Sequence, residues 1–114
     1  MEEIILPLPF KVGPSELSVL SFMIRDIESA PFFLSDVALG TKLPGGNVSP
    51  VLKKYVSLEV ISCTDSLETY MDESGERPRR LFRLTRPGID VTRNILTGFF
   101  LPKSPTNPIT YIRR

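Results

Sequence analysis

The chain of 114 residues carries a formal net charge of +1, with 41% hydrophobic and 24% charged residues. These values are typical of one compact, soluble domain. They exclude a chain that is disordered throughout, and no apolar run reaches the roughly 20 residues that span a bilayer. A single cysteine, Cys63, cannot form an internal disulfide, so we expect a protein of the reducing cytoplasm.

The first 28 residues predict an arm followed by a helix. A short apolar run and several prolines over 1–14 indicate an extended arm or a short strand. A helix is predicted over 15–28, because Ser15 can cap it and Glu16 suits the positive end of the helix dipole. Apolar residues then recur at spacings of three and four, which predicts one buried stripe. The stripe comprises Leu17, Leu20, Ile24 and Ile27.

A short strand and a short helix are predicted next. The apolar segment Phe32–Leu34 favours a strand. Ser35 followed by Asp36 is a capping signal for a brief helix that reaches about Lys42. The run 44–46, one proline and two glycines, is interpreted as the break that ends this helix.

The third predicted helix has the clearest pattern. Asn47 is a suitable N-cap, and Pro50 falls in the first turn, where its missing N–H is least harmful. One face is apolar and predicts packing on a core. It comprises Val48, Val51, Leu52, Tyr55 and Val56. The opposite face is polar and basic without any acid, and comprises Asn47, Ser49, Pro50, Lys53, Lys54 and Ser57.

A β-hairpin and a last helix complete the predicted elements. β-Branched residues over 60–64 and the alternation of apolar and polar residues over 79–84 indicate two strands, joined by a polar loop over 66–78. Thr85 caps the last helix, whose start is favoured by Pro87. Its apolar face comprises Val91, Ile95 and Phe99 and is interrupted at Gly98.

This order of elements predicts an α+β fold, a winged helix-turn-helix. It has a three-helix core, a two-stranded β-hairpin wing and a short C-terminal helix. We expect an N-terminal arm over 1–14, the winged helix-turn-helix over 15–98 and an extended tail over 99–114.

Two surfaces are predicted to bind double-stranded DNA. The third helix fits the major groove, where Asn47 and Ser49 reach base edges and Lys53 and Lys54 lie nearer the phosphates. The hairpin loop is flexible and then basic, which suits phosphates or a narrow minor groove. Its DNA-binding residues are Arg77, Arg79 and Arg80.

The segments 48–54 and 75–88 resemble those of the PadR-like winged-helix regulators, which share their style with MarR and ArsR relatives. The family pattern continues from the wing as aromatic–Arg–Leu–Thr–x–x–Gly, and the matching residues are Phe82, Arg83, Leu84, Thr85 and Gly88. The resemblance covers roughly 15–97 and implies a homodimer that reads an inverted repeat, with an effector that the sequence does not name.

The end of the chain departs from that family. Family members dimerise through long C-terminal helices, whereas here the last predicted helix is short and the tail contains Pro102, Pro105 and Pro108. A dimer is therefore expected to use the first helix, the N-terminal arm or the segment Ile109–Ile112.

Other roles are weighed against these. The absence of histidine removes the usual general base, and with one cysteine it excludes the common zinc sites, so we expect no enzyme, no metal and no cofactor. Arg83 is expected to pair with an acid on the first helix, Cys63 to be half-buried in a strand and Tyr55 to be a core residue. The rival function is a protein–protein adaptor, or a replication or partition accessory protein of a plasmid, virus or mobile element.

Overall fold

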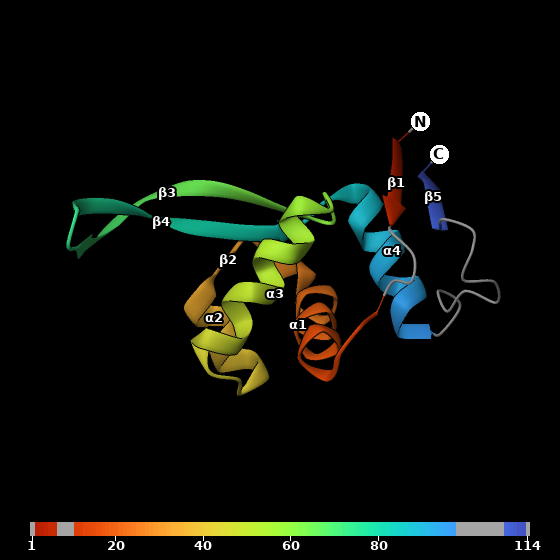
Figure 1. The fold of residues 1–114 in the computed structure, drawn as a ribbon, viewed down its shortest axis with the longest axis horizontal. Coiled ribbons are helices and arrows are strands. Elements are labelled where there is room, and N and C mark those ends of the chain that lie inside the picture. Colours follow the sequence, from red (N-terminus) through yellow and green to blue (C-terminus); the bar gives the residue numbers. More distant parts are fainter. Residues whose placement is uncertain (1, 7–10, 98–108, 114) are drawn as a thin grey trace.

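The structure, a computed structural model, describes residues 2–6, 11–97 and 109–113, with side chains for 11–97. Helices α1, α2 and α3 form a compact body, from which the hairpin β3–β4 projects on one side, while α4 and the two terminal strands lie on the other (Figure 1). In chain order the elements are β1 (Glu2–Leu6), α1 (Pro14–Arg25), a 3-10 helix (Ile27–Ser29), β2 (Phe32–Phe33), α2 (Leu34–Thr41), α3 (Gly45–Ser57), β3 (Ile61–Asp72), β4 (Gly75–Leu84), α4 (Arg86–Thr97) and β5 (Ile109–Arg113).

Helix α1 starts one residue earlier than predicted, and Ser15 is not its cap. Gly13 is the N-cap and Pro14 occupies the first helical position, which its fixed φ angle favours. The Glu16 carboxylate accepts a hydrogen bond from the Gly13 amide at 3.4 Å. The N-cap amide of α1 is thus paired with a side chain three residues further along the chain. The α-helix ends at Arg25, and Ile27–Ser29 continues as a separate 3-10 turn.

The buried face of α1 is rotated from the predicted stripe. Val19, Leu20, Phe22 and Met23 are buried, whereas Leu17 is 38% exposed and Ile24 and Ile27 only border the core. Leu20 thus confirms the prediction, and Leu17 was placed wrongly. The spacing of residues could not distinguish these faces, because apolar side chains lie around most of this helix.

The pair α2 and α3 confirms the helix-turn-helix, with different caps. The α2 helix begins at Leu34, and the Asp36 carboxylate accepts the Phe33 amide at 2.8 Å. Lys42 ends α2 in the left-handed region, at φ 61°. Pro44 rather than Asn47 is the N-cap of α3, so the two glycines predicted as a break form its first turn. The predicted apolar face is confirmed: Val48, Val51, Leu52 and Tyr55 are buried, and Val56 borders the core.

The wing is longer and more regular than predicted. Strand β4 lies between β2 and β3 in an antiparallel sheet, and the β3–β4 pairing runs from Ile61↔Leu84 to Asp72↔Gly75. The loop predicted over 66–78 is therefore wrong, because most of it forms strand. The turn is closed by a hydrogen bond of 2.7 Å from the Ser74 amide to the Asp72 carboxylate, and Gly75 adopts φ +115°.

Thr85 caps α4 as predicted and fixes it to the sheet. Its hydroxyl accepts the Gly88 amide at 2.9 Å and donates to the Glu59 carbonyl at 2.8 Å. A β-carbon on Gly88 would lie 2.0 Å from the Val60 carbonyl oxygen, so only glycine fits there. Val91 and Ile95 are buried as expected, and the predicted core residue Phe99 lies outside the described residues.

The two ends of the chain meet in a small antiparallel ribbon. Strand β1 pairs with β5 from Glu2↔Arg113 to Leu6↔Ile109, and the ribbon lies beside α4 (Figure 1). The strand expected in the arm is thus present, and part of the predicted extended tail is also a strand. Pro102, Pro105 and Pro108 lie outside the described residues.

The element order confirms the α+β class and the winged helix-turn-helix arrangement, with α3 in the place of a recognition helix. Among the described helices, none has both the length and the hydropathy needed to cross a membrane.

Candidate nucleic-acid interface

The outer face of α3 is the candidate surface for the major groove. Successive helical residues point about 100° apart, so the side opposite the buried Val48 and Leu52 carries Pro50 and Lys53. Lys53 is exposed, Asn47 is exposed on one flank, and Ser49 is half-buried on the other. This face contains no acid, as predicted, and it is open to a partner.

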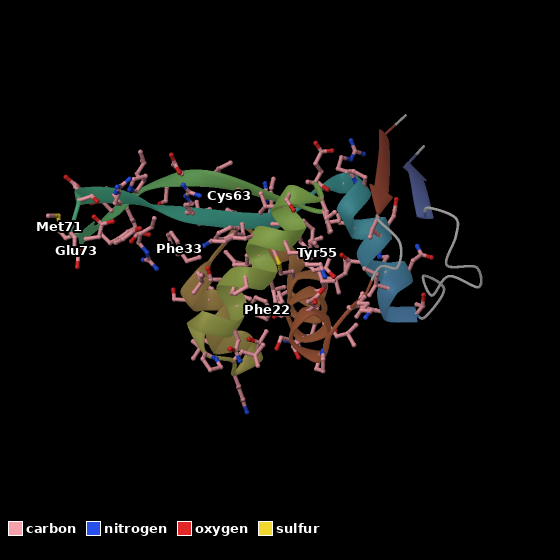
Figure 2. All side chains as sticks on the ribbon, viewed as in Figure 1. Phe22, Phe33, Tyr55, Cys63, Met71 and Glu73 are labelled. Carbon is pink, nitrogen blue, oxygen red and sulfur yellow. The ribbon has the colours of Figure 1, made fainter. Side chains whose placement is uncertain are left out.

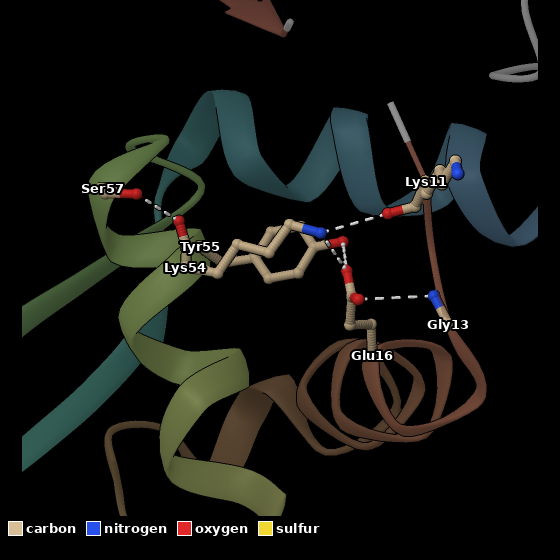
Figure 3. A network of polar contacts seen from close by, with 6 residues as sticks. All are labelled: Lys11, Gly13, Glu16, Lys54, Tyr55 and Ser57. Atoms are coloured by element: carbon tan, nitrogen blue, oxygen red, sulfur yellow. Dashed lines mark hydrogen bonds and ion pairs between the residues drawn. The ribbon is translucent and has the colours of Figure 1, made fainter. Parts of the chain in front are cut away.

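Lys54 lies on the Asn47 side of that face, seven residues further along the helix, but its side chain is held by α1 and the arm. Its ammonium lies 2.7 Å from Oε1 of Glu16 on α1 and donates to the Lys11 carbonyl at 3.1 Å (Figure 3). The Tyr55 hydroxyl donates to the same Glu16 oxygen at 2.7 Å. The structure therefore directs Lys54 toward α1 and the arm, about 100° around the helix from Lys53.

The protonation of this network is well defined. Burial opposes ionisation of Glu16, but hydrogen bonds from Lys54, Tyr55 and Gly13 outweigh it and lower the pKa of its carboxyl. Burial, together with the hydrogen bond to Glu16, raises the pKa of the Tyr55 hydroxyl far above its ordinary value. At neutral pH the network therefore consists of a carboxylate with an ammonium and a phenol as its donors.

The predicted wing arginines lie on strand β4 rather than on a flexible loop, and each faces an acid of β3. The shortest distances are 3.3 Å for Arg77–Asp72, 3.9 Å for Arg79–Glu68 and 4.0 Å for Arg80–Asp65. Exposed pairs of this length contribute little, roughly 0–1 kcal/mol, and are easily exchanged for other partners. The three arginines thus have a structural use that the sequence reading did not foresee.

Arg79 is the most firmly placed of them. Its guanidinium lies 3.9 Å from the centroid of the Phe33 ring and donates to the Ser35 hydroxyl at 3.1 Å. Arg79 therefore connects the base of the wing to the start of α2. Neighbouring residues of a strand point to opposite faces, so Arg80 points away from Arg79.

The tip of the wing is acidic and apolar, which corrects the expectation of an arginine-rich tip. Figure 2 shows Met71 and Glu73 at the end of the hairpin, far from Tyr55 in the helical body. Leu67, Tyr70 and Met71 are exposed. The acids near the turn are Glu68, Asp72, Glu73 and Glu76, against Arg77 as the nearby base. Basic charge on the wing is therefore concentrated toward its base.

Other residues were expected elsewhere or were missed. Arg83 donates to the Ala30 carbonyl at 3.3 Å, so the expected ion pair with an acid on the first helix is replaced by a backbone contact in the described structure. Cys63 is half-buried in β3 as predicted. Lys42, exposed in the turn between α2 and α3, was not selected as a site residue, although it lies in the acid-free stretch between Asp36 and Glu59 that includes α3.

In the part of the chain that has described side chains, no three His, Cys, Asp or Glu residues are grouped so that they could hold a metal ion.

No family model and no curated protein sequence matches this chain. Solved structures do match in fold. MepR of Staphylococcus aureus, a transcription regulator of the multidrug efflux pump MepA, is 19% identical with a TM-score of 0.56, over 79% of this chain and 59% of MepR. ZitR of Lactococcus lactis, a zinc-responsive MarR family member, is 19% identical with a TM-score of 0.55, over 78% of this chain and 54% of ZitR.

BpsR of Bordetella bronchiseptica, whose DNA binding is regulated by 6-hydroxynicotinic acid, is 17% identical with a TM-score of 0.58, over 76% of this chain and 58% of BpsR. MepR is also solved in complex with DNA, and that structure has a TM-score of 0.53 to this chain at 19% identity. The chain spans a little more than half the length of MepR, ZitR and BpsR.

At these identities the likeness concerns the fold. It is a winged-helix fold of the kind found in MarR-type regulators, and no neighbour described above supports the PadR-like assignment.

Proposed function

We propose that the chain is a transcriptional regulator that binds double-stranded DNA, with α3 in the major groove and the base of the wing on the flanking backbone or minor groove. The observation that carries this proposal is the exposed, acid-free face of α3 with Lys53 at its centre. The neighbours in fold are transcription regulators, and one of them, MepR, is solved on DNA. The adaptor and accessory functions find no such support.

The residue roles follow from position. Asn47 and Ser49, in the first turns of α3, would reach base edges, and Lys53 a turn later would reach a phosphate. Arg79 and Arg80 at the base of the wing, with Arg77 further out, would exchange their weak acid partners for phosphates. Lys54 was expected to contact DNA together with these residues, but its ion pair with Glu16 indicates a structural role instead.

The finer features of the proposal are those of a cytoplasmic regulator without enzymatic activity that acts as a homodimer. We propose that α1, or the terminal segments that pair as β1 and β5, form the contact between the two copies. Light scattering of the purified chain measures its mass directly. A stable monomer at micromolar concentration, with and without DNA, would contradict the dimer.

Fluorescence anisotropy with duplexes selected by the chain from a random library tests DNA binding. Each phosphate contact releases counterions, so log K should fall linearly with log salt concentration, by about 0.9 per contact. We expect Lys53→Ala to weaken binding about tenfold and to reduce that slope by about 0.9. Arg93→Ala is the matched control, because Arg93 is exposed on α4, on the other side of the body. Equal effects of the two variants, or affinity that does not depend on salt, would overturn the proposal.

A further inference from the structure

Glu16 connects the start of α1 and the end of the arm just before it to α3, which lies 38 residues further along the chain (Figure 3). Its carboxylate receives the Gly13 amide from the arm side of α1 and both Lys54 and Tyr55 from α3. The Lys54 ammonium returns to the arm at the Lys11 carbonyl. We call these groups of Lys11, Gly13, Glu16, Lys54 and Tyr55 the Glu16 clamp.

The clamp supplies what apolar packing between α1 and α3 cannot. Burial of Leu20 and Met23 of α1 in the same core as Leu52 holds the helices together, but the hydrophobic effect has no direction. Hydrogen bonds depend steeply on distance and angle, and those to charged groups are the strongest. The clamp therefore fixes the rotation of α3 about its own axis relative to α1.

That rotation matters at the other end of α3. The clamp holds Lys54 and Tyr55, whereas Asn47 lies about two turns away, roughly 10–12 Å along the axis, and Ser49 about one and a half turns away, roughly 8–9 Å. A base-edge hydrogen bond weakens steeply when its donor–acceptor distance or angle departs from the ideal. Phosphate contacts through long, flexible side chains are more tolerant of such a displacement.

We propose that Glu16 is a positioning residue that sets the orientation of the recognition helix and ties it to the N-terminal arm, with Lys54 as its structural partner rather than a DNA contact. The inference rests on the proposed function, since its consequence is sequence discrimination on DNA. Loss of the clamp leaves the charge of Lys53 in place and loosens the alignment of Asn47 and Ser49. Discrimination between sequences then falls, while general affinity for DNA is retained.

The experiment compares two labelled duplexes of equal length, one enriched by the parent chain from a random library and one of the same composition with scrambled order. The readout is the ratio of the two dissociation constants at fixed salt. We expect Glu16→Gln to lower this ratio about tenfold, with affinity for the scrambled duplex unchanged within about twofold. Glu28→Gln, at an exposed glutamate of the 3-10 turn, is the matched control and should leave the ratio unchanged.

Two further variants separate positioning from folding and from direct contact. Tyr55→Phe removes only the hydroxyl and keeps the buried ring, so it should fold and lower the ratio about threefold. Lys54→Arg preserves a donor to Glu16 and should retain the ratio, whereas Lys54→Met should lower it. The effects of Glu16→Gln and Lys54→Met should not add in the double variant, because both break the same pair.

Hydrogen exchange of the free protein gives a readout independent of DNA. We expect amides in the second half of α3 to exchange at least tenfold faster in Glu16→Gln than in Glu28→Gln. An unchanged discrimination ratio together with unchanged exchange overturns the inference. A Lys54→Met variant that weakens both duplexes equally and lowers the salt slope by about 0.9 also overturns it, by showing that Lys54 contacts a phosphate. A parent chain that binds neither duplex contradicts the proposed function, and the exchange measurement still decides the role of Glu16.

Discussion

At the scale of single residues, this fold depends on a few close contacts for which one side chain is suited. Gly88 lies so near the Val60 carbonyl that no β-carbon fits. At the same place the Thr85 hydroxyl forms hydrogen bonds with the Gly88 amide of α4 and with the Glu59 carbonyl just before β3. The Thr–x–x–Gly spacing thus has a physical cause: the hydroxyl caps α4 while the glycine lets the helix approach the end of β3. The same residues carried the family resemblance seen in the sequence.

A substitution at Gly88 tests this account. Gly88→Ala should destabilise the chain by about 3 kcal/mol, because α4 must move away from Val60 and strain its cap. Gly46→Ala is the matched control: nothing lies within 4 Å of its added β-carbon, and alanine favours helix. It should stabilise by roughly 0.5–1 kcal/mol. Urea denaturation followed by circular dichroism measures the free energy of unfolding of both variants. An equal decrease of that free energy for the two substitutions would refute the close contact at Gly88.

At the scale of elements, the wing is a pair of strands in which acids of β3 face arginines of β4. Cross-strand pairs such as Arg77–Asp72 and the 2.7 Å hydrogen bond from Thr69 to Glu76 stabilise a hairpin with few buried apolar residues. The pairing order β2–β4–β3 anchors it to the body at Phe32 and Phe33. The wing is therefore rooted at its base and supported mainly by surface contacts toward its tip.

The two neighbouring arginines of β4 should differ in their effect on stability. Arg79 contacts the Phe33 ring, Ser35 and Glu68, whereas Arg80 has a long, exposed pair with Asp65. Arg79→Ala is expected to cost about 1–2 kcal/mol of unfolding free energy, and Arg80→Ala less than about 0.5 kcal/mol. Thermal melting of the two variants measures this order. Equal melting temperatures would show that the contacts of Arg79 with α2 do not support the wing.

At the scale of the whole molecule, one apolar core unites three helices, the sheet and α4. Its buried members come from every one of these elements, so α3 is held against the body by the residues of its inner face. The wing projects from the side of the body opposite α4 and the terminal ribbon (Figure 1).

Two leucines in neighbouring helices measure the contribution of that core. Leu20 on α1 is fully buried, whereas Leu39 on α2 is 81% exposed. Leu20→Ala should lower the free energy of unfolding by about 3 kcal/mol, because it leaves a cavity in the core. Leu39→Ala should keep that free energy within about 0.5 kcal/mol of the parent value. Calorimetry or urea denaturation provides both values. A loss at Leu39 comparable to that at Leu20 would mean that α2 is covered in solution, for example by a second copy.

The sequence by itself determined the order of elements, the fold class, the apolar face of α3 and the Thr85 cap. These depend on local periodicity and on contacts a few residues apart, which a chain displays without folding. Tertiary structure decided the rest. Lys54 and Lys53 are adjacent basic residues on an acid-free face, and only the approach of Glu16, 38 residues earlier in the chain, separates their roles. In the same way, most of the predicted loop over 66–78 is strand, because β3 and β4 pair almost to their turn, and the register of that pairing is not visible in the local sequence.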